Sequence, residues 1–254
     1  MSTPHLQSGL FSDTGVVRHG YFGRQGGVSA GEFGSLNVSL TTGDDVENVT
    51  ANRAIVADAM AGGPLVILKQ VHSNRVVTVE AGTLPDASIE ADALVTRRAD
   101  VLLGVLTADC APLLFIDHHA GVIGAAHAGW KGAVTGIVEN TLRAMEALGA
   151  QCRRIAMDIG PTISGDKYEV GPAFMAEAVA INPAAAEAFF TPEGGREHFD
   201  LPRFLLNDAL RAGLTQVDMR KACTYADPDR FFSHRYATHH ATRTGRQVAV
   251  IGLA

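Results

Sequence analysis

Short apolar runs separated by polar residues and glycines dominate the first half of the chain. The runs are five to seven residues long and mostly rich in Val, Ile and Leu, and such segments predict β-strands. They occupy residues 16–22, 65–69, 75–79, 101–107, 112–116 and 121–126. The chain closes on another strand-like segment, residues 246–253. We therefore expect a protein that is rich in short strands.

The hydrophobic spacing becomes helical from Val134. Apolar residues recur every three or four positions from there, and Gly149 is well placed to end the helix. Another helix is predicted to begin at Asp200, with Pro202 in its first turn. Several strands follow one another between residues 65 and 126 before the next helix. This order favours an α/β fold with a mixed sheet or packed sheets and outer helices, rather than strict alternation of strands and helices.

Length and composition bound the organisation of the chain. With 254 residues, 46% of them hydrophobic, the chain can build one substantial core, and its length does not require two domains. Residues 23–37 are rich in glycine and are interpreted as an ordered loop, while residues 182–197 form a second irregular segment. Strand-like and helix-like segments lie close on both sides of each, so neither is interpreted as a linker. We expect residues 1–254 to form a single domain.

Charge and cysteine usage exclude several classes of protein. The net charge is −6 and no run of Lys or Arg occurs, which argues against nucleic acid as a partner. The N-terminal segment lacks the features of a signal peptide, and no apolar run approaches the length of a membrane span. The three cysteines, Cys110, Cys152 and Cys223, are odd in number and far apart, which argues against a disulfide framework. We expect a cytoplasmic protein with reduced thiols and no membrane partner.

Two patterns that resemble catalytic motifs are rejected. Residues 27–31 match G-x-S-x-G, but the strand before it and the helix after it that a serine hydrolase requires are missing. The adjacent pairs His118–His119 and His239–His240 are interpreted as exposed loop histidines, since neighbouring side chains point in opposite directions on an extended chain.

Three residues of the kind that bind zinc each follow a strand-like apolar run. They are His72, Cys110 and His127. Because residues at the carboxyl ends of strands can converge in one site, we expect these three to meet. Two imidazoles and a thiolate suit zinc, and three protein ligands leave the fourth position open, as in a catalytic site. The alternative is two satisfied core histidines and one inert buried cysteine.

Asp109 lies between two apolar runs, where an unpaired carboxylate would be costly to bury. Next to Cys110, it is expected either to support a metal site or to contact the substrate. The alternative is a paired buried carboxylate with a structural role.

Arg53 shares the apolar face of a predicted helix with Val49, Val56 and Met60. An inward-pointing guanidinium needs an anion, and its planar fork suits a phosphate or a carboxylate. The alternatives are a buried salt bridge, or a side chain that extends from the edge of the face to solvent.

Seven segments together resemble the YfiH family, also called multicopper polyphenol oxidoreductase or laccase-domain proteins. They read HGYFGRQGGVSAGEFGSLN, KQVHS, TADCAPLLF, AAHAGWKG, IGPTISGDKYEVG, CTYADPDRFFSHR and TGRQVAVIGL. The resemblance runs from about Gly20 to Leu253, and the motifs occur in the right order. Two motifs depart from the usual family forms, QVHS replacing QVHG and AGWKG replacing AGWRG. The second places Lys131 where an arginine is usual, so a bidentate contact to phosphate there is lost.

The resemblance implies a single catalytic domain with a layered α/β/β/α fold, a mixed β-sandwich and outer helices. It also implies a zinc site made of His72, Cys110 and His127, the same trio that the strand ends predict. The implied reaction is phosphorolysis of adenosine, inosine, guanosine or methylthioadenosine to the base and a sugar 1-phosphate, with adenosine deamination as a further activity. Purine nucleosides and phosphate would then be the ligands of a monomer or homodimer.

For a phosphorylase of this kind, we expect Cys110, Asp109 and His127 to carry the chemistry. Candidates for contacts to phosphate or substrate are Arg53, Arg24, Asn37 and Lys69, together with the main-chain N–H groups of the glycine-rich loop. The metal could bind phosphate or a sugar hydroxyl, or activate a water.

Three other functions stay open. The first is copper-dependent oxidation of phenols, but the ten histidines include no His-x-His pair and no methionine is placed as an axial ligand. The second is a cysteine hydrolase with Cys110 as nucleophile and His127 or His72 as base. The third is a binding module stabilised by a metal, without turnover.

Overall fold

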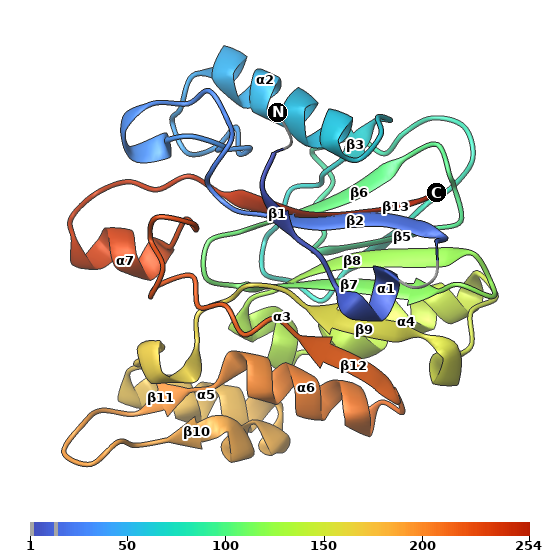
Figure 1. The fold of residues 1–254 in the computed structure, drawn as a ribbon. Helices are drawn as coiled ribbons and strands as arrows, with labels where there is room; N and C mark the ends of the chain where they lie inside the picture. Colours follow the sequence, from blue (N-terminus) through green and yellow to red (C-terminus); the bar gives the residue numbers. More distant parts are fainter. Residues whose placement is uncertain (1–2, 13–14) are drawn as a thin grey trace.

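Two mixed β-sheets pack face to face in the computed structural model, which describes residues 3–12 and 15–254 (Figure 1). The first sheet has the strand order β1-β2-β13-β6-β3. Its strands are β1 (His5–Leu6), β2 (Val17–Phe22), β13 (Gln247–Leu253), β6 (Leu102–Thr107) and β3 (Leu65–Val66). The strand β13 pairs antiparallel with both β2 and β6, whereas β3 runs parallel to β6. The last strand of the chain therefore lies at the centre of this sheet.

The second sheet has the strand order β12-β9-β7-β8-β5-β4. Its strands are β12 (Gln216–Met219), β9 (Ala156–Ile159), β7 (Ala111–Asp117), β8 (Val122–Ala128), β5 (Ala93–Thr96) and β4 (Val76–Val79). A hairpin of β7 and β8 forms its centre, while the edge strands β12 and β4 run parallel to their neighbours. A separate two-stranded sheet joins β10 (Phe189–Phe190) and β11 (His198–Phe199).

The space between the two large sheets is filled by aliphatic side chains from both. Leu103, Val105 and Ile251 come from the first sheet, and Leu114 and Ile123 come from the second. Successive side chains of a strand point to opposite faces, so each sheet contributes alternate residues to this shared layer. The common core supports the expectation of one domain, which stays a prediction.

Helices cover the outer faces of both sheets, which gives the order α/β/β/α that the resemblance implies (Figure 1). On the first sheet, α2 (Val46–Ala59) buries Val56 against Leu102, Val248 and Val250. The helices α3 (Trp130–Val134), α4 (Ile137–Ala147) and α6 (Leu201–Arg211) pack against the second sheet, with α5 (Pro172–Ile181) beside them. The short helices are α1 (Gly9–Ser12), α7 (His234–His239) and the 3-10 turns at Gly31–Phe33, Cys152–Arg154, Gly165–Lys167 and Pro183–Ala188.

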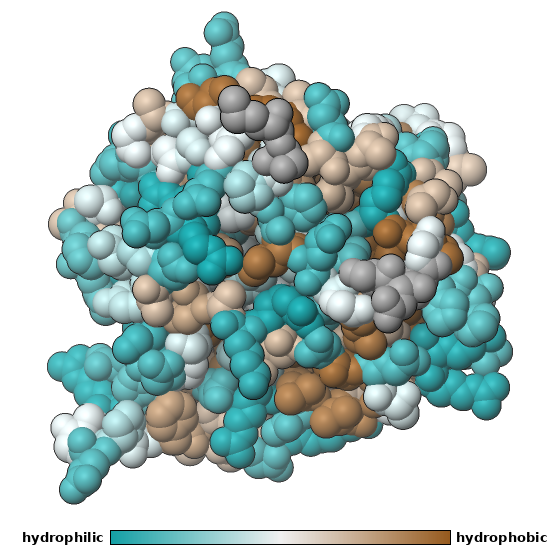
Figure 2. Space-filling model, in the orientation of Figure 1, coloured by the Kyte–Doolittle hydropathy of each residue, from teal (hydrophilic) through white to brown (hydrophobic). Residues whose placement is uncertain are grey.

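Most elements that the hydrophobic pattern predicts are confirmed, with shifts that have local causes. The helix expected from Val134 begins at Ile137 instead, because Gly136 adopts a left-handed conformation with φ of 91° and separates α4 from α3, which ends at Val134. Gly149, with φ of 97°, ends α4 as predicted. Asp200 caps α6, since its side chain accepts a hydrogen bond from the main-chain N–H of Arg203. None of the helices formed by the described residues combines the length and apolar character needed to span a membrane. On the face shown in Figure 2, hydrophilic residues predominate and hydrophobic residues form small separate patches.

The packing of α4 on α6 brings two carboxyl groups together and predicts a pH dependence of stability. Burial, followed by the negative charge of Glu139, raises the pKa of Asp208 to about 7. The folded protein therefore holds a proton that the unfolded chain has lost, and the free energy of unfolding falls as the pH rises from about 4 to about 7. We expect Asp208→Asn to raise Tm at pH 8 by roughly 2–4 °C for each kcal/mol of stability regained, and by less at pH 5, measured by thermal denaturation.

The matched control is Glu80→Gln, which removes an exposed carboxylate elsewhere on the chain. It should leave the difference in Tm between pH 5 and pH 8 as in the wild type. If Asp208→Asn changes Tm equally at both pH values, the buried pair does not share a proton in this pH range.

Candidate metal centre

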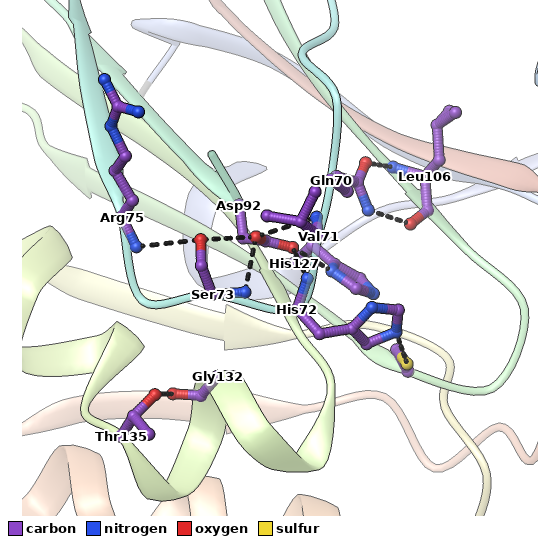
Figure 3. Close-up of polar contacts among 11 residues, drawn as sticks. Gln70, Val71, His72, Ser73, Arg75, Asp92, Leu106, His127, Gly132 and Thr135 are labelled. Carbon is purple, nitrogen blue, oxygen red and sulfur yellow. Dashed lines mark hydrogen bonds and ion pairs between the residues drawn. The ribbon is translucent and has the colours of Figure 1, made fainter. Parts of the chain in front are cut away.

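His72, Cys110 and His127 meet as the sequence predicts, although they do not all stand at strand ends. His72 lies in the loop after β3, Cys110 directly precedes β7, and His127 lies inside β8. Their ligand atoms all lie within 4.8 Å of one another, and His72 Nε2 is 3.9 Å from Cys110 Sγ. Figure 3 shows the imidazoles of His72 and His127 beside each other, with a dashed line from His72 to the sulfur. Within the described residues, this is the one group of three or more such side chains close enough to hold a metal ion.

The strand register explains why Cys110 and His127 are neighbours. In the β7–β8 hairpin, Ala111 pairs with Ala128 and Pro112 pairs with His127, so Cys110 extends β7 beside the end of β8. Directly after β8, Gly129 fits beside the candidate ligands only because it has no side chain. A Cβ there would lie 2.6 Å from His72 Cδ2 and 3.2 Å from Cys110 Sγ. The glycine that follows β8 therefore leaves the space in which the ligands meet.

Asp92 holds two of the three candidate ligands and was not predicted from the sequence. Its Oδ1 accepts hydrogen bonds from His127 Nδ1 at 2.8 Å and from the main-chain N–H of His72 at 3.0 Å (Figure 3). Its Oδ2 accepts from the main-chain N–H groups of Val71 and Ser73 and from the Ser73 hydroxyl. The side chain of Asp92 is almost fully buried. One carboxylate thus fixes the histidine loop and the ring of His127, leaving Nε2 of His127 free to face the sulfur.

Burial would raise the pKa of the Cys110 thiol, but the charge and hydrogen bond of His127 outweigh it and lower that pKa to about 6. Conversely, burial would lower the pKa of His127, but the thiolate of Cys110 and the hydrogen bond to Asp92 raise it to about 9. Burial opposes ionisation of Asp92, yet its hydrogen bonds to His127 and Ser73 lower its pKa to about 2. The site therefore favours a thiolate at Cys110, the form of cysteine that binds metals.

Asp109 occupies the turn before Cys110 as a paired buried carboxylate, the structural alternative that the sequence left open. Its Oδ1 accepts a hydrogen bond from the Thr224 hydroxyl at 2.7 Å, and its Oδ2 accepts from the main-chain N–H of Arg235 at 2.6 Å. Its main-chain carbonyl accepts from the Thr162 hydroxyl and from the N–H of Ile163. Asp109 therefore ties the segment that bears Arg235 to the turn that bears Cys110.

A cavity of about 240 Å³ opens above the candidate ligands. Its lining combines two of the three candidate ligands with acidic, aromatic, aliphatic and cationic side chains, namely His72, Ala108, Asp109, Cys110, Trp130, Ile163, Tyr168, Leu201, His234 and Arg235. The guanidinium of Arg235 lies 5.3 Å from the centre of the Tyr168 ring, a cation–π arrangement. The cavity thus offers flat apolar surface and positive charge beside the cluster.

Arg24 and Asn37, two of the sequence-predicted phosphate candidates, are hydrogen-bonded within the glycine-rich loop and its neighbours. Arg24 Nε donates to the Gly34 carbonyl and Nη1 donates to the Pro228 carbonyl. Asn37 is fully buried, and its Oδ1 accepts from the main-chain N–H of Arg246 at 2.9 Å. Neither residue lines the cavity above the cluster.

Arg53 and Lys69 also lie outside the lining of this cavity. Arg53 is half-buried on α2, as its place on the apolar face predicts, and its Nε donates to the Val38 carbonyl at 2.8 Å. The partner that the structure gives it is a main-chain carbonyl rather than a carboxylate. Lys69 forms an exposed ion pair with Glu90 at 2.8 Å. The phosphate roles of all four candidates stay predictions.

The adjacent histidine pairs are exposed, as predicted. His118 and His119 lie in the turn after β7, whereas His239 is the last residue of α7 and not a loop residue. The cation of Lys131 lies 5.3 Å from the centre of the Trp130 ring, at the edge of the cavity lining.

A two-sheet sandwich covered by helices, with a His–Cys–His cluster at the base of a cavity, defines a candidate metalloenzyme of the α/β class. The family model described as multi-copper polyphenol oxidoreductase laccase matches residues 18–254. The chain therefore belongs to this family, and the resemblance to the YfiH proteins is confirmed.

Curated relatives and solved structures agree with this placement. A Deinococcus radiodurans protein named purine nucleoside phosphorylase is 42% identical over 243 residues, covering 94% of this chain and 90% of the relative. A Corynebacterium glutamicum protein of the same name is 39% identical over 240 residues, covering 93% of this chain and 94% of the relative. The crystal structure of Neisseria meningitidis protein NMB0706, a DUF152 family member, covers 100% of this chain and 99% of its own, at 33% identity and a TM-score of 0.86. The crystal structure of Bacillus licheniformis hypothetical protein YfiH covers 94% of this chain and 93% of its own, at 30% identity and a TM-score of 0.84.

Proposed function

We propose that this protein is a zinc-dependent purine nucleoside phosphorylase. In the reaction, the bond between C1′ of the sugar and the purine nitrogen breaks with its electron pair going to the base. A phosphate oxygen forms the new bond to C1′, and the base leaves after gaining a proton, so that the products are a purine and a sugar 1-phosphate. The observation that carries the proposal is the His72–Cys110–His127 cluster at the base of a cavity with aromatic and cationic walls.

The donor set suits zinc. In a tetrahedral zinc site, bonds of about 2.3 Å to sulfur and about 2.0 Å to nitrogen place neighbouring ligand atoms roughly 3.5 Å apart. The 3.9 Å between His72 Nε2 and Cys110 Sγ needs only a small adjustment to reach this spacing. When bound by these three side chains, the metal would act as a Lewis acid beside the cavity. Copper accepts the same donors, but the described residues contain one such cluster, whereas multicopper oxidation needs several copper sites.

Four of the other cavity residues form two groups with different roles. Trp130 and Tyr168 offer the flat apolar surface on which a purine can stack. Arg235 and His234 offer positive charge or hydrogen-bond donors for phosphate. Holding the two reactants together on opposite sides of C1′ removes the entropic cost of bringing them into line. Asp109 positions Arg235 through its main-chain N–H, so its part in the reaction is to place the cationic wall.

The test is base release from adenosine, inosine and guanosine with and without phosphate, alongside metal analysis of protein purified without chelators. The proposal expects phosphate-dependent release of free base, a sugar 1-phosphate product and about one zinc per chain. Ammonia released from adenosine without base release would instead indicate deamination as the main activity. Phenol oxidation that tracks copper content would support the copper-dependent alternative.

Two arginine variants test where phosphate binds. We expect Arg235→Lys to raise the apparent KM for phosphate about tenfold, because the ammonium lacks the planar fork that matches phosphate oxygens. Arg53→Lys is the matched comparison, since Arg53 is the candidate that the sequence pattern favours and its Nε already bonds the Val38 carbonyl. Steady-state kinetics with varied phosphate measures both variants. A larger effect in Arg53→Lys than in Arg235→Lys would restore the sequence-based assignment.

A further inference from the structure

The cavity above the candidate metal centre adjoins a second, wider groove. This groove of about 740 Å³ is lined by residues 169–172 and by Arg196, Glu197, Arg235 and His239. Arg235 belongs to the lining of both spaces, so they meet at its side chain. A nucleoside that fills the first cavity would leave the groove open to a substituent on the sugar.

Main-chain hydrogen bonds join two segments that line this groove. The N–H of Val170 donates to the Glu197 carbonyl at 2.8 Å, and the N–H of Phe199 donates to the Tyr168 carbonyl at 3.1 Å. Tyr168 ends a 3-10 turn and lines the metal cavity, while the next residue, Glu169, pairs with His198 and lines the groove. The two spaces are therefore fixed relative to each other by one paired segment.

The charges around the groove are balanced. Glu169 and Glu197 supply two carboxylates, while Arg196 and Arg235 supply two guanidinium groups. The ion pair between Arg196 and Glu169, at 3.0 Å, is exposed and contributes little to stability, so a ligand can replace it at low cost. A group with one ammonium and one carboxylate can pair with charges of both signs on this surface, whereas a phosphate can pair only with the guanidinium groups.

We propose that the groove binds the 5′ substituent of a purine nucleoside when that substituent ends in an α-amino acid. The inference rests on the proposed function, which places C1′ at the metal cavity and the base against its aromatic walls. C5′ is then the sugar carbon from which a chain can pass Arg235 into the groove. The tail carboxylate would face Arg196, and its ammonium would face Glu169 and Glu197. Phosphorolysis would release the purine and leave the tail on the sugar 1-phosphate.

The test compares S-adenosylhomocysteine with 5′-methylthioadenosine, which shares the thioether but lacks the amino acid. We expect calorimetry without phosphate to show about tenfold tighter binding of S-adenosylhomocysteine to the wild type. Arg196→Ala and Glu197→Gln should each lower this ratio of affinities several-fold. The control Glu193→Gln removes an exposed carboxylate outside the groove lining and should keep the wild-type ratio.

The failure of this inference is distinguishable from the failure of the proposed function. Equal affinities for the two thioethers, or a ratio that neither groove variant changes, overturns the groove assignment even if adenosine is phosphorolysed. Tighter binding of adenosine 5′-monophosphate than of either thioether would also overturn it, since the groove would then select a phosphate. Absence of base release from every nucleoside overturns the proposed function, while a thioether preference measured by calorimetry would still support the groove.

Discussion

Cys110→Ala is expected to abolish zinc binding and base release together while the fold survives. Cys110 supplies the only thiolate of the candidate ligand set, and two imidazoles alone hold zinc far more weakly. The side chain is small and lies at the wall of a cavity, so its truncation leaves the packing of the sheets intact. We expect zinc content to fall from one to below about 0.1 per chain and activity to fall to background. Metal analysis, kinetics and thermal denaturation on the same preparation measure these outcomes.

Cys152→Ala is the matched control, because Cys152 is also a free, half-buried cysteine but donates to the Ala212 carbonyl far from the cluster. It should retain both zinc and activity. Stoichiometric zinc in Cys110→Ala would show that the ligand assignment is wrong. Loss of activity with zinc retained would favour Cys110 as a nucleophile and thus the cysteine hydrolase.

Asp92→Asn is expected to weaken zinc binding about 10- to 100-fold, the usual effect of losing a carboxylate that orients a metal-binding histidine. Asp92 accepts hydrogen bonds from His127 and from the main chain of the loop that bears His72. An amide has one accepting oxygen, so its NH₂ group would face the N–H groups of Val71 and Ser73 and displace that loop. Competition with a chelator of known affinity measures the change.

Asp117→Asn separates this effect from general destabilisation. Asp117 is also a fully buried carboxylate that accepts main-chain N–H groups, but it lies at the opposite end of β7 from Cys110. We expect Asp117→Asn to lower Tm while leaving zinc affinity within about twofold of the wild type, a small change on the scale of the 10- to 100-fold expected for Asp92→Asn. If Asp92→Asn lowers Tm but, like Asp117→Asn, leaves zinc affinity close to that of the wild type, Asp92 supports the fold and not the metal site.

The ligand trio could be predicted from the sequence because its signals are local. Each of His72, Cys110 and His127 is a ligand-type residue beside an apolar run, and a sheet brings such positions together. Asp92 has a weaker local signal, a carboxylate directly before the apolar residues 93–95. Its role depends on partners 20 and 35 positions away, which no pattern within one segment reveals.

The phosphate candidates illustrate a different limit. The helical pattern correctly places Arg53 on a face that is partly buried, but it does not identify the partner, which is the Val38 carbonyl. That contact depends on how the glycine-rich loop returns to α2, and irregular loops have no period from which to predict it. The cationic residue that lines the cavity, Arg235, belongs to the short helix α7, whose position Asp109 fixes from another part of the chain.

The fold shows the same division between local and distant information. Longer strands and the amphipathic α4 have clear patterns and are confirmed, whereas β5, β9 and β12 are four residues each and were not predicted. Four positions are few for alternation to be recognised. The strand β4 has the same length but could be predicted, because three of its four residues are valine. The place of β5, β9 and β12 in the second sheet is fixed by pairing with β8, β7 and β9, respectively, which is tertiary information.

The reactivity of Cys110 toward iodoacetamide tests the central claim, that this cysteine acts as a metal ligand, most directly. In the zinc-loaded protein, Cys110 should stay largely unmodified by mass spectrometry while base-release activity is retained. After chelation, Cys110 should be alkylated much faster, because its pKa near 6 leaves it as thiolate at neutral pH, and the modified protein should not regain activity with zinc. Rapid alkylation of Cys110 in the zinc-loaded protein, or a covalent substrate adduct on its sulfur, would contradict the account.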